Sequence, residues 1–455
     1  MQIPLGLGYN KHPERFVSVE NTLNMQPEAS FGGRSDVILR SCPGLSQFSA
    51  GNTSGTEGRG GVFVNNTLYV VLGKYLYSVS SAGVATQIDR VDGNGKCGVS
   101  TTSDEIFVAT NAGDYVFNIT SGTLAAEGDS PASRSVAMVN GRFVKPDPNA
   151  TGTSAGRFFW SDVLDGTTWN GLNFATAEQK PDRSIAVAGL GNTLLVFGEE
   201  TLEIWRGDAN GFVPITGAAQ PFGIAGELAL AQADGLVCFL SSDGSVRVTN
   251  GSRPQRVSTP AVEASLAADS ATECVAYREE GHTVFEFSTA TQTLCYDHAQ
   301  SQLLGKPVWF EKQTNDTRHK VSAYIYGYSK TLALADDDGK VYELTRSAYP
   351  DVRQFTIPHL HDDANRDWNR LDEIELMCRT GSGAIPSDDP QVVLTISRDH
   401  GYTWGEERWA GLGTIGNYSN RIRWRRLGRF LQMTLRFRLT DQVDWTVTGI
   451  QARGR

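Results

Sequence analysis

A short run rich in His and Asp offers the residue types that bind metal ions. The segment HLHDD, from His359 to Asp363, holds two imidazoles and two carboxylates. On a strand, His359 and His361 would share one face. Asp362 and Asp363 would then point to opposite faces, so only one carboxylate could join the imidazoles without a turn. Because no further ligand is evident in the sequence, we interpret this run as an exposed interdomain linker rather than a metal site.

The run DDDG, from Asp336 to Gly339, is a second candidate, in this case for calcium. It lacks the D-x-D-x-D-G register and the distal Glu of an EF-hand loop. An Asp-Gly pair between two apolar runs is instead a strong hairpin signal. We therefore predict a polar hairpin turn at this position, and neither a bound metal nor a cofactor.

A third motif offers the chemistry of a tight turn. Its residues fit the pattern S-x-D-x-G-x-T-W and are Ser397, Asp399, Gly401, Thr403 and Trp404. In such a turn the carboxylate accepts backbone N–H groups and the Trp packs beneath it. The pattern resembles the Asp-box hairpin of sialidases, in which the box belongs to the fold and does no catalysis. We therefore predict a structural turn.

A sialidase-like hydrolase would need more than the Asp-box. It would need an arginine triad, a Tyr nucleophile with a nearby Glu, and an Asp acid. The candidates Arg157, Arg183, Arg206 and Tyr277 follow no motif, and the box occurs once. We therefore expect no catalytic residues and a protein that is not an enzyme. A carbohydrate-active β-propeller hydrolase is the alternative hypothesis.

The densest charge feature is the run RIRWRRLGRF, from Arg421 to Phe430. With Arg436 and Arg438 it places seven arginines within eighteen residues. If the run is a strand, alternate residues share a face, with Arg421, Arg423 and Arg425 on one and Ile422, Trp424 and Arg426 on the other. The candidate contact residues are Arg421, Arg423, Arg425, Arg426 and Arg429.

Three interpretations of this arginine stripe remain open. A subunit contact is favoured first, because planar guanidinium groups pair with carboxylates through two hydrogen bonds. Pairing within the chain, on adjacent strands, comes close behind. Contact with passing DNA ranks third in a chain of net charge −10. The intramolecular partners would be Glu373, Glu375, Glu406 and Glu407.

The composition limits the class of protein. A chain of 455 residues, 40% apolar, predicts a large core and two or three domains. The net charge of −10 disfavours sequence-independent DNA binding, which needs clustered Lys and Arg. An acidic surface would suit a lumen through which DNA slides without sticking, although ordinary solubility is the simpler explanation.

Six scattered cysteines lack a C-x-x-C pattern, and we interpret them as buried free thiols in a reduced cytosol. The N-terminal sequence lacks the basic segment and apolar run of a secretion signal. No stretch reaches the roughly 18 apolar residues of a membrane span. We therefore expect neither signal nor span. The cysteines are Cys42, Cys97, Cys238, Cys274, Cys295 and Cys378.

These residues must be positioned by strands, because hairpin-like units dominate the sequence. Each unit has two apolar runs around a short Gly, Asp or Asn turn. The units recur about every 37 to 51 residues, close to the 40 to 50 residues of a four-stranded propeller blade. We predict an all-β chain whose β-propeller has six or seven blades, with Trp160, Trp169 and Trp205 as blade anchors. The units span residues 66–79, 104–119, 141–162, 192–207, 235–250, 282–297 and 330–345.

The domain plan follows from where this rhythm begins and ends. Residues 1–35, rich in Pro, Gly and Asn, predict an extended N-terminal arm, either disordered or laid against a neighbour. Residues 36–348 would form the propeller, and its last blade would be closed by the strand at 36–48. Residues 349–455, with longer alternating strands, predict a jelly-roll-like β-sandwich. The best helical candidate is 259–269, with Thr259 as its cap.

The order of the motifs resembles one family. The segments Phe159–Asp182 and Phe197–Trp205 are similar to the packaged-DNA-stabilisation, or tail-hub (nozzle), proteins of short-tailed bacteriophages. The resemblance extends over nearly the whole chain. Further similar segments are Asn21–Met25, Ser41–Leu45, Arg253–Glu263, Tyr296–His319 and Asp399–Arg429.

The resemblance implies a structural part of a phage tail. Six copies would form a ring below the portal and its adaptor ring. That ring would extend the DNA channel, help retain the packaged genome, and anchor tailspikes or fibres and a plugging needle. Its partners would be itself, the adaptor, these appendages and double-stranded DNA without sequence specificity. It would reside in the virion tail after assembly in the host cytoplasm. A propeller that acts as a monomeric interaction module is the third hypothesis.

Overall fold

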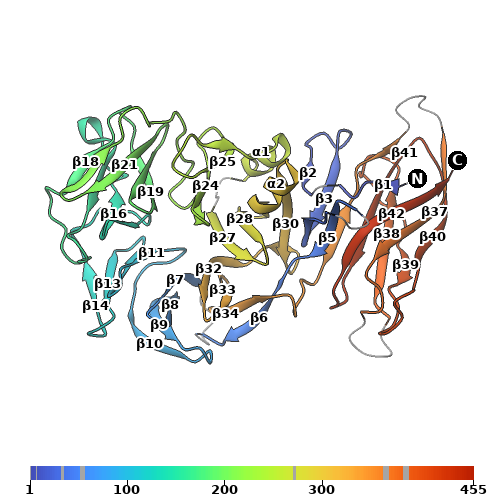
Figure 1. The fold of residues 1–455 in the computed structure, drawn as a ribbon, viewed down its shortest axis with the longest axis horizontal. Helices are drawn as coiled ribbons and strands as arrows, with labels where there is room; N and C mark the ends of the chain where they lie inside the picture. The colour runs from blue at the N-terminus through green and yellow to red at the C-terminus, as the bar shows by residue number, and fades with distance from the viewer. Residues whose placement is uncertain are drawn as a thin grey trace.

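The computed structural model describes residues 2–6, 8–31, 35–51, 57–269, 273–361, 368–382 and 389–454, without the side chain of His361. Almost all of its elements are β-strands. They form a propeller and a sandwich, side by side along the long axis, with N-terminal strands between them (Figure 1). This arrangement confirms the predicted fold class, an all-β propeller followed by a β-sandwich.

The described residues form seven blades of four antiparallel strands. Each predicted hairpin unit coincides with the two middle strands of one blade. Blades 1 to 4 are β7 Gly58–Val64, β8 Thr67–Leu72, β9 Tyr75–Val79, β10 Ala85–Arg90; β11 Gly98–Thr101, β12 Glu105–Ala109, β13 Asp114–Asn118, β14 Thr123–Glu127; β15 Ala137–Val139, β16 Arg142–Pro146, β17 Arg157–Trp160, β18 Phe174–Thr176; and β19 Ser184–Leu190, β20 Thr193–Gly198, β21 Leu202–Asp208, β22 Gly211–Pro214. Blades 5 to 7 are β23 Leu230–Ala233, β24 Leu236–Leu240, β25 Val246–Thr249, β26 Gln255–Arg256; β27 Glu273–Glu279, β28 His282–Ser288, β29 Thr293–Asp297, β30 Val308–Thr314; and β32 Val321–Gly327, β33 Lys330–Ala335, β34 Val341–Thr345, with β6 Gly44–Ser49 as the fourth strand.

Local turn chemistry explains why the blades are visible in the sequence. Asn65 and Asn66 have φ of 47° and 57° and join β7 to β8. Asn140 and Gly141 have φ of 55° and 74° and join β15 to β16. Two successive residues with positive φ give a type I′ turn, whose twist matches that of paired antiparallel strands. These hairpins therefore form from neighbouring residues.

The propeller core consists of apolar layers between adjacent blades. Leu68 and Val70 of blade 1 pack with Leu332 and Leu334 of blade 7, and all four side chains are fully buried. Such a ring of sheets must be closed, because otherwise the first and last blades would expose apolar faces. β6 provides the closure by pairing with β34, for example Leu45 with Leu344.

The predicted closing segment, residues 36–48, divides between the two domains. Its second half enters β6 of blade 7. Its first half is β5, Val37–Ser41, which pairs with β4, Met25–Ala29, and with β42, Thr446–Gly454, in the sandwich. The chain crosses from one domain to the other at Cys42 and Pro43.

The described part of residues 1–35 differs from the extended arm that its composition predicts. Its strands are β1 Gln2–Ile3, β2 Asn10–Lys11, β3 Val19–Leu23 and β4, and each pairs within one of the two sheets of the sandwich. The Tyr9 amide donates to the Trp309 carbonyl of blade 6 at 2.6 Å. These strands are short, and β1 and β3 pair with strands far along the chain, so the segment leaves no periodicity in the sequence. We call residues 8–31 the N-terminal strap.

The sandwich packs two sheets around a core that contains Phe355, Phe437 and Trp445. One sheet has the order β4-β5-β42-β37-β40. The other, β3-β35-β41-β38-β39, continues through β3 into β30 of blade 6, so that one twelve-stranded sheet spans both domains. The strands of the two sandwich sheets not yet given are β35 Arg353–Thr356, β36 Leu360–His361, β37 Asn369–Cys378, β38 Gln391–Ser397, β39 Arg408–Gly411, β40 Ile422–Phe430 and β41 Gln432–Leu439.

Two short α-helices interrupt the strands of the described residues. Helix α1, Pro260–Ala267, is the predicted one, and the Thr259 side chain accepts a hydrogen bond from the Val262 amide at its start. Helix α2, His298–Leu304, was not predicted, and the Asp297 side chain caps it by accepting from the Gln300 amide. A 3-10 turn, Gly152–Ser154, and β31, Thr317–Arg318, complete the elements.

Candidate assembly interface

The arginine stripe lies on β40, an outer strand of the sandwich. β40 pairs with β37, which in turn pairs with β42. Ile422 and Trp424 point into the core and are buried, whereas Arg421 and Arg425 are exposed. The alternation predicted for a strand therefore holds over this part of the run.

The exposed arginines meet two glutamates of β37. Arg421 Nε donates to Glu375 Oε1 at 2.8 Å, and Arg425 Nε donates to Glu373 Oε2 at 2.7 Å. Hydrogen bonds from these guanidinium groups hold the pKa of each carboxyl below its usual value. A third arginine, Arg453 of β42, lies 3.8 Å from Glu373. Pairing within the chain, the second of the three interpretations of the stripe, is therefore present for Arg421 and Arg425.

A bulge in β40 changes the face on which Arg426 lies. The pairing of β37 with β40 shifts register between Leu371 and Glu373, and Arg426 has a φ of 59°. The one extra residue of β40 at this bulge turns Arg426 to solvent and places Leu427 in the core. Arg426 was predicted to share a face with Ile422 and Trp424, and this placement is wrong because the bulge breaks the two-residue period.

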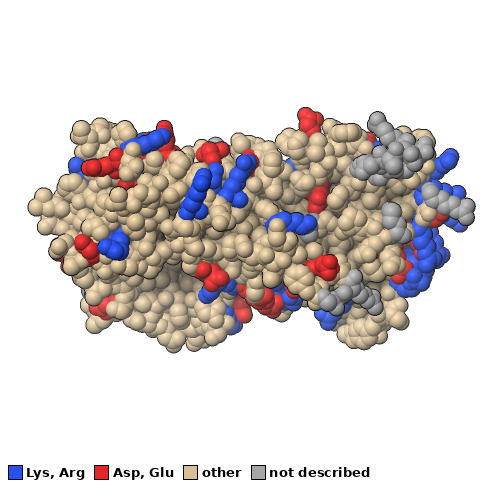
Figure 2. Space-filling model, turned by 45° about the horizontal axis from the view of Figure 1, so that its top comes forward, with Lys and Arg blue, Asp and Glu red and all other residues tan. Residues whose placement is uncertain are grey.

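The arginine face remains cationic after its internal pairs are counted. Arg426 and Arg429 are exposed and Arg423 is half-buried. Residues 350–455 hold 15 arginines and no lysine, against 14 Asp and Glu, in a chain of net charge −10. Lys and Arg side chains gather at the end of the molecule where β37 and β40 lie (Figure 2). We call Arg421, Arg423, Arg425, Arg426, Arg429 and Arg453 the arginine face.

Sequence reasoning missed Arg453 as part of this surface. It lies 28 residues beyond Arg425 in the chain and joins the face only because β42 pairs with the other edge of β37. The alternating run from Thr446 to Gly454 could be recognised in the sequence. The order of the strands in the sheet could not. The face is therefore a product of sheet topology.

The S-x-D-x-G-x-T-W residues form a hydrogen-bonded turn after β38. The Asp399 carboxylate accepts from the Thr403 amide at 2.9 Å and from the Thr403 hydroxyl at 2.6 Å. These bonds lower the pKa of Asp399 to about 2. Ser397 Oγ accepts from the Gly401 amide at 2.8 Å, and Gly401 has a φ of 80°. Trp404 lies beside Arg436, whose guanidinium is 3.9 Å from the ring centre.

The three predicted anchor tryptophans are buried in the propeller. Trp160 and Trp205 belong to one core cluster shared by blades 3 and 4, and the rings of both lie against Phe158. Trp169 packs on Phe107, with ring centres 5.7 Å apart, and its indole N–H donates to the Gly166 carbonyl at 2.9 Å. Each therefore contributes to contacts between neighbouring blades.

Where the structure describes the metal candidates, their side chains form hydrogen bonds within the fold. His359 contacts the Thr434 hydroxyl at 2.5 Å and the Arg15 carbonyl at 2.8 Å, while Asp362, Asp363 and the side chain of His361 lie outside the described residues. The 336–339 run joins β33 to β34, and Asp338 accepts from the Lys340 amide at 3.1 Å. No cluster of three or more His, Cys, Asp or Glu able to hold a metal occurs in the described part of the chain.

All six cysteines are free thiols; five are buried and Cys378 is half-buried. Burial raises the pKa of the Cys97 thiol to about 11. Within the described ranges, no helix is long and apolar enough to cross a membrane.

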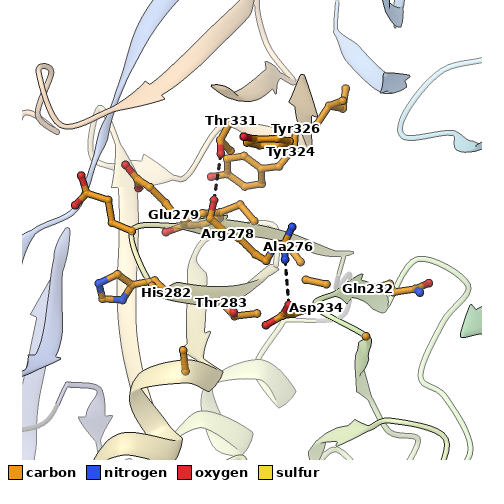
Figure 3. Close-up of a pocket in the computed structure, with 17 residues that line it drawn as sticks. Gln232, Asp234, Ala276, Arg278, Glu279, His282, Thr283, Tyr324, Tyr326 and Thr331 are labelled. Carbon is orange, nitrogen blue, oxygen red and sulfur yellow. Dashed lines mark hydrogen bonds and ion pairs between the residues drawn. The ribbon is translucent and has the colours of Figure 1, made fainter. Parts of the chain in front are cut away.

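A cavity of about 920 Å³ opens between blades 5, 6 and 7 (Figure 3). Asp234 and Arg278 form an ion pair of 3.0 Å across it, and the Thr331 hydroxyl donates to the Arg278 carbonyl at 3.1 Å. Tyr277, a predicted sialidase candidate, is buried beside it. The candidate arginines at 157, 183 and 206 belong to blades 3 and 4, so the structure does not gather the set that a sialidase would need.

Comparison with known families covers nearly the whole chain. Residues 1–349 match the family described as "Bacteriophage P22 Gp10, beta-propeller", and residues 352–455 match "Bacteriophage P22 Gp10, beta-sandwich". Fold and matches together define a structural protein of the bacteriophage tail, built as a propeller and a sandwich. The chain belongs to the bacteriophage P22 Gp10 family of tail-hub and DNA-stabilisation proteins, which confirms the resemblance found in its sequence.

Solved structures similar to the chain are distant in sequence. The computationally designed Ika8 protein is 11% identical, with a TM-score of 0.42, over 66% of this chain and 99% of its own. PorZ of Porphyromonas gingivalis, a component of the type-IX secretion system, is 14% identical, with a TM-score of 0.40, over 66% of this chain and 38% of its own. The N-terminal domain of Nup159 is 9% identical, with a TM-score of 0.42, over 66% and 95%. No curated protein matches.

Proposed function

We propose that six copies of this chain form a closed ring at the tail of a short-tailed phage, below the portal and its adaptor ring. The ring extends the DNA channel and helps retain the packaged genome. It anchors tailspikes or fibres and receives a plugging needle, while double-stranded DNA passes without sequence-specific contacts. The subunits fold in the host cytoplasm and join the virion during assembly.

The observation that carries this proposal is the sheet that runs through both domains. β3 pairs with β35 of the sandwich by three residue pairs and with β30 of blade 6 through Leu23 and Glu311. Asn21 of β3 adds a side-chain hydrogen bond of 2.8 Å to Glu311. Backbone hydrogen bonds across the junction resist bending between the domains. A stiff wall of this kind suits a channel that holds densely packed DNA.

The arginine face supplies a surface for a neighbouring subunit. Its guanidinium groups can form two parallel hydrogen bonds with carboxylates of another copy, whose first 349 residues are strongly acidic. Arg421 and Arg425 are held in place by Glu375 and Glu373, so less side-chain entropy is lost when a partner binds. We therefore assign this face to a contact between subunits rather than to DNA.

Charge reversal at the arginine face tests the assignment. We expect the double variant Arg425→Glu/Arg426→Glu to fold normally but to fail to form rings with the adaptor, because like charges would then meet at the contact. Mass measurement of the assembled particles reports the result. Arg379→Glu, at the end of β37 and paired with Asp444, is the matched control and should assemble normally. Undiminished ring formation by the double variant would remove the face from the contact.

A further inference from the structure

Three exposed aliphatic side chains gather in the loop between β17 and β18 of blade 3. Val163, Leu164 and Leu172 are 55%, 57% and 82% exposed. Asn173, next to Leu172, donates its side-chain amide to the Asp162 carboxylate at 3.1 Å, which ties the two halves of the loop together. Single exposed apolar residues are common, but a group of them marks a contact surface. The loop, which we call the blade 3 tip, consists of residues 161–173.

The turn at the blade 3 tip gives no reason of its own for a leucine. The Asp165 amide donates to the Asp162 carbonyl at 3.4 Å across a four-residue turn whose central residues are Val163 and Leu164. Leu164 has a φ of 58°, at a position where such turns favour Gly or Asn. An Asn there would keep the turn and remove only the apolar side chain.

Carboxylates without ion pairs surround the tip. Asp104 of blade 2 and Asp162 are exposed, and Asp165 is half-buried. The loops of the two blades lie together, because the Gly166 amide donates to Glu105 at 2.7 Å. Burial and the nearby carboxylates of Asp165 and Asp104 raise the pKa of Glu105. In the part of the chain that the structure describes, the three aspartates accept hydrogen bonds from neutral groups and form no ion pair.

The arginine face has the complementary character. Arg426 and Arg429 are exposed, and neither forms an ion pair within the described ranges. Tyr418 is 74% exposed and lies three residues before Arg421. Its carbonyl accepts from the Thr380 hydroxyl at 2.9 Å, just beyond the end of β37, so it adds an aromatic side chain at the border of the face. Arg and Tyr are both enriched where proteins meet.

Symmetry and charge point to a second copy of this chain as the occupant. A cationic face cannot pair with itself, because like charges repel, so the neighbour must present a different and acidic surface. A closed ring of more than two copies also needs two different contact surfaces on each copy. Blade 3 and β40 lie at opposite ends of the long axis of the molecule (Figure 1). Each copy can therefore offer one surface to each of its two neighbours.

Acidic groups elsewhere on the propeller suit this contact less well. Glu199 and Glu200 of blade 4, for example, already pair with Arg183 and Lys180. The aspartates of the blade 3 tip have no such partners to lose, and they flank an apolar centre. An apolar centre with a charged rim is the usual arrangement of a protein contact.

We propose that the blade 3 tip of one copy docks on the arginine face of the next copy. Val163 and Leu164 pack beside Tyr418, while Asp104 and Asp162 pair with the exposed arginines around it. This inference rests on the proposed ring and names the contact that closes it.

Exchange of charges between the two surfaces tests the proposal. Wild type mixed with the adaptor ring is the reference, and mass measurement counts the copies in each particle. We expect Asp104→Arg/Asp162→Arg to abolish ring formation. Addition of Arg425→Glu/Arg426→Glu to the same chain should restore the rings, because opposite charges then meet again. The control Glu14→Arg/Asp89→Arg makes the same change of charge away from the tip and should assemble like wild type.

Leu164→Asn tests the apolar part of the contact. Because Asn suits a φ of 58°, the variant should melt at the same or a higher temperature than wild type. It should nevertheless raise the protein concentration needed for ring formation by about tenfold or more. Leu303→Asn is the matched control, since Leu303 is 55% exposed but lies on α2 of blade 6. It should leave ring formation unchanged.

The outcomes separate this contact from the ring itself. Thermal melting verifies that each variant is folded. Ring formation that survives Asp104→Arg/Asp162→Arg, or a folded four-substitution chain that does not regain rings, would overturn the contact and leave the ring standing. Absence of rings from wild type would overturn the proposed ring and this contact with it.

Discussion

Single buried charges join segments that are far apart in the sequence. His282 of blade 6 is 2% exposed, and its Nδ1 lies 2.5 Å from the Asp297 carboxylate. Its Nε2 lies 3.9 Å from Glu28 of the strap. Burial opposes the charged imidazole, but the hydrogen bonds to Asp297 and Glu28 outweigh burial and raise the pKa of His282 to about 9. Arg346 is the nearby cation that opposes this shift.

The raised pKa of His282 predicts a loss of stability in alkaline solution. The protonated imidazole stabilises the fold fully below its unfolded pKa of about 6.5 and progressively less as the pH rises through about 9. We expect wild type to lose up to about 3 kcal/mol relative to His282→Gln between these values. Urea unfolding of both proteins across this pH range measures the difference. Parallel pH profiles would contradict the prediction.

The anchor tryptophans give a second prediction at the level of single residues. Trp205 is 5% exposed and packs edge-on against Phe158, with ring centres 5.0 Å apart. We expect Trp205→Ala to reduce the free energy of unfolding by about 3–5 kcal/mol, because a large cavity would remain between blades 3 and 4. Trp409→Ala is the control, since Trp409 is 56% exposed. Equal denaturation midpoints of the two variants would exclude Trp205 as an anchor.

At the scale of elements, the N-terminal strap connects the two domains and depends on close backbone contacts. Gly8 has a φ of 120°, and a Cβ atom there would lie 1.8 Å from the Trp309 carbonyl oxygen. Only glycine fits this approach, because an L side chain rarely adopts such a φ and would also collide with the backbone of β30.

Gly8→Ala should therefore loosen the strap. We expect at least about 1–3 kcal/mol of destabilisation from backbone strain alone, and faster amide hydrogen exchange in residues 8–23. Gly171→Ala is the matched control, because a Cβ atom there would meet nothing within 4 Å and its φ is ordinary. Identical exchange in the two variants would show that the strap does not depend on Gly8.

The sequence predicts those elements whose partners are neighbours in the chain. All seven hairpin units were found because β8 and β9, or β24 and β25, pair across short turns. Strand β3 of the strap could not be predicted in the same way. β3 pairs with β30 and β35 at separations of about 290 and 330 residues, and a strand of five residues carries too little pattern to select such partners.

The candidate site shows the same limit. Pairing of the arginines with glutamates on adjacent strands was the second of three interpretations of the sequence, and the ion pair of Arg421 with Glu375 shows that such pairing occurs. Arg426 was misplaced because a bulge is a property of two paired strands rather than of one. A cavity between the strap and the two domains was not predicted at all, because the residues around it, such as Lys11 and Arg436, come from opposite ends of the chain.

At the scale of the whole molecule, the fold is a closed propeller joined to a sandwich through a shared sheet. β6 closes the propeller, and the twelve-stranded sheet carries hydrogen bonding from blade 6 into the sandwich. The propeller region is acidic in net charge, whereas the arginine face of the nearly neutral sandwich is cationic. In the proposed ring, such a subunit would meet copies of itself through surfaces of complementary charge.

Negative-stain electron microscopy of the purified chain mixed with its adaptor ring tests this account most directly. The account predicts closed rings with six-fold symmetry and a continuous central channel. Particles that remain single propeller–sandwich units in the presence of the adaptor would contradict it.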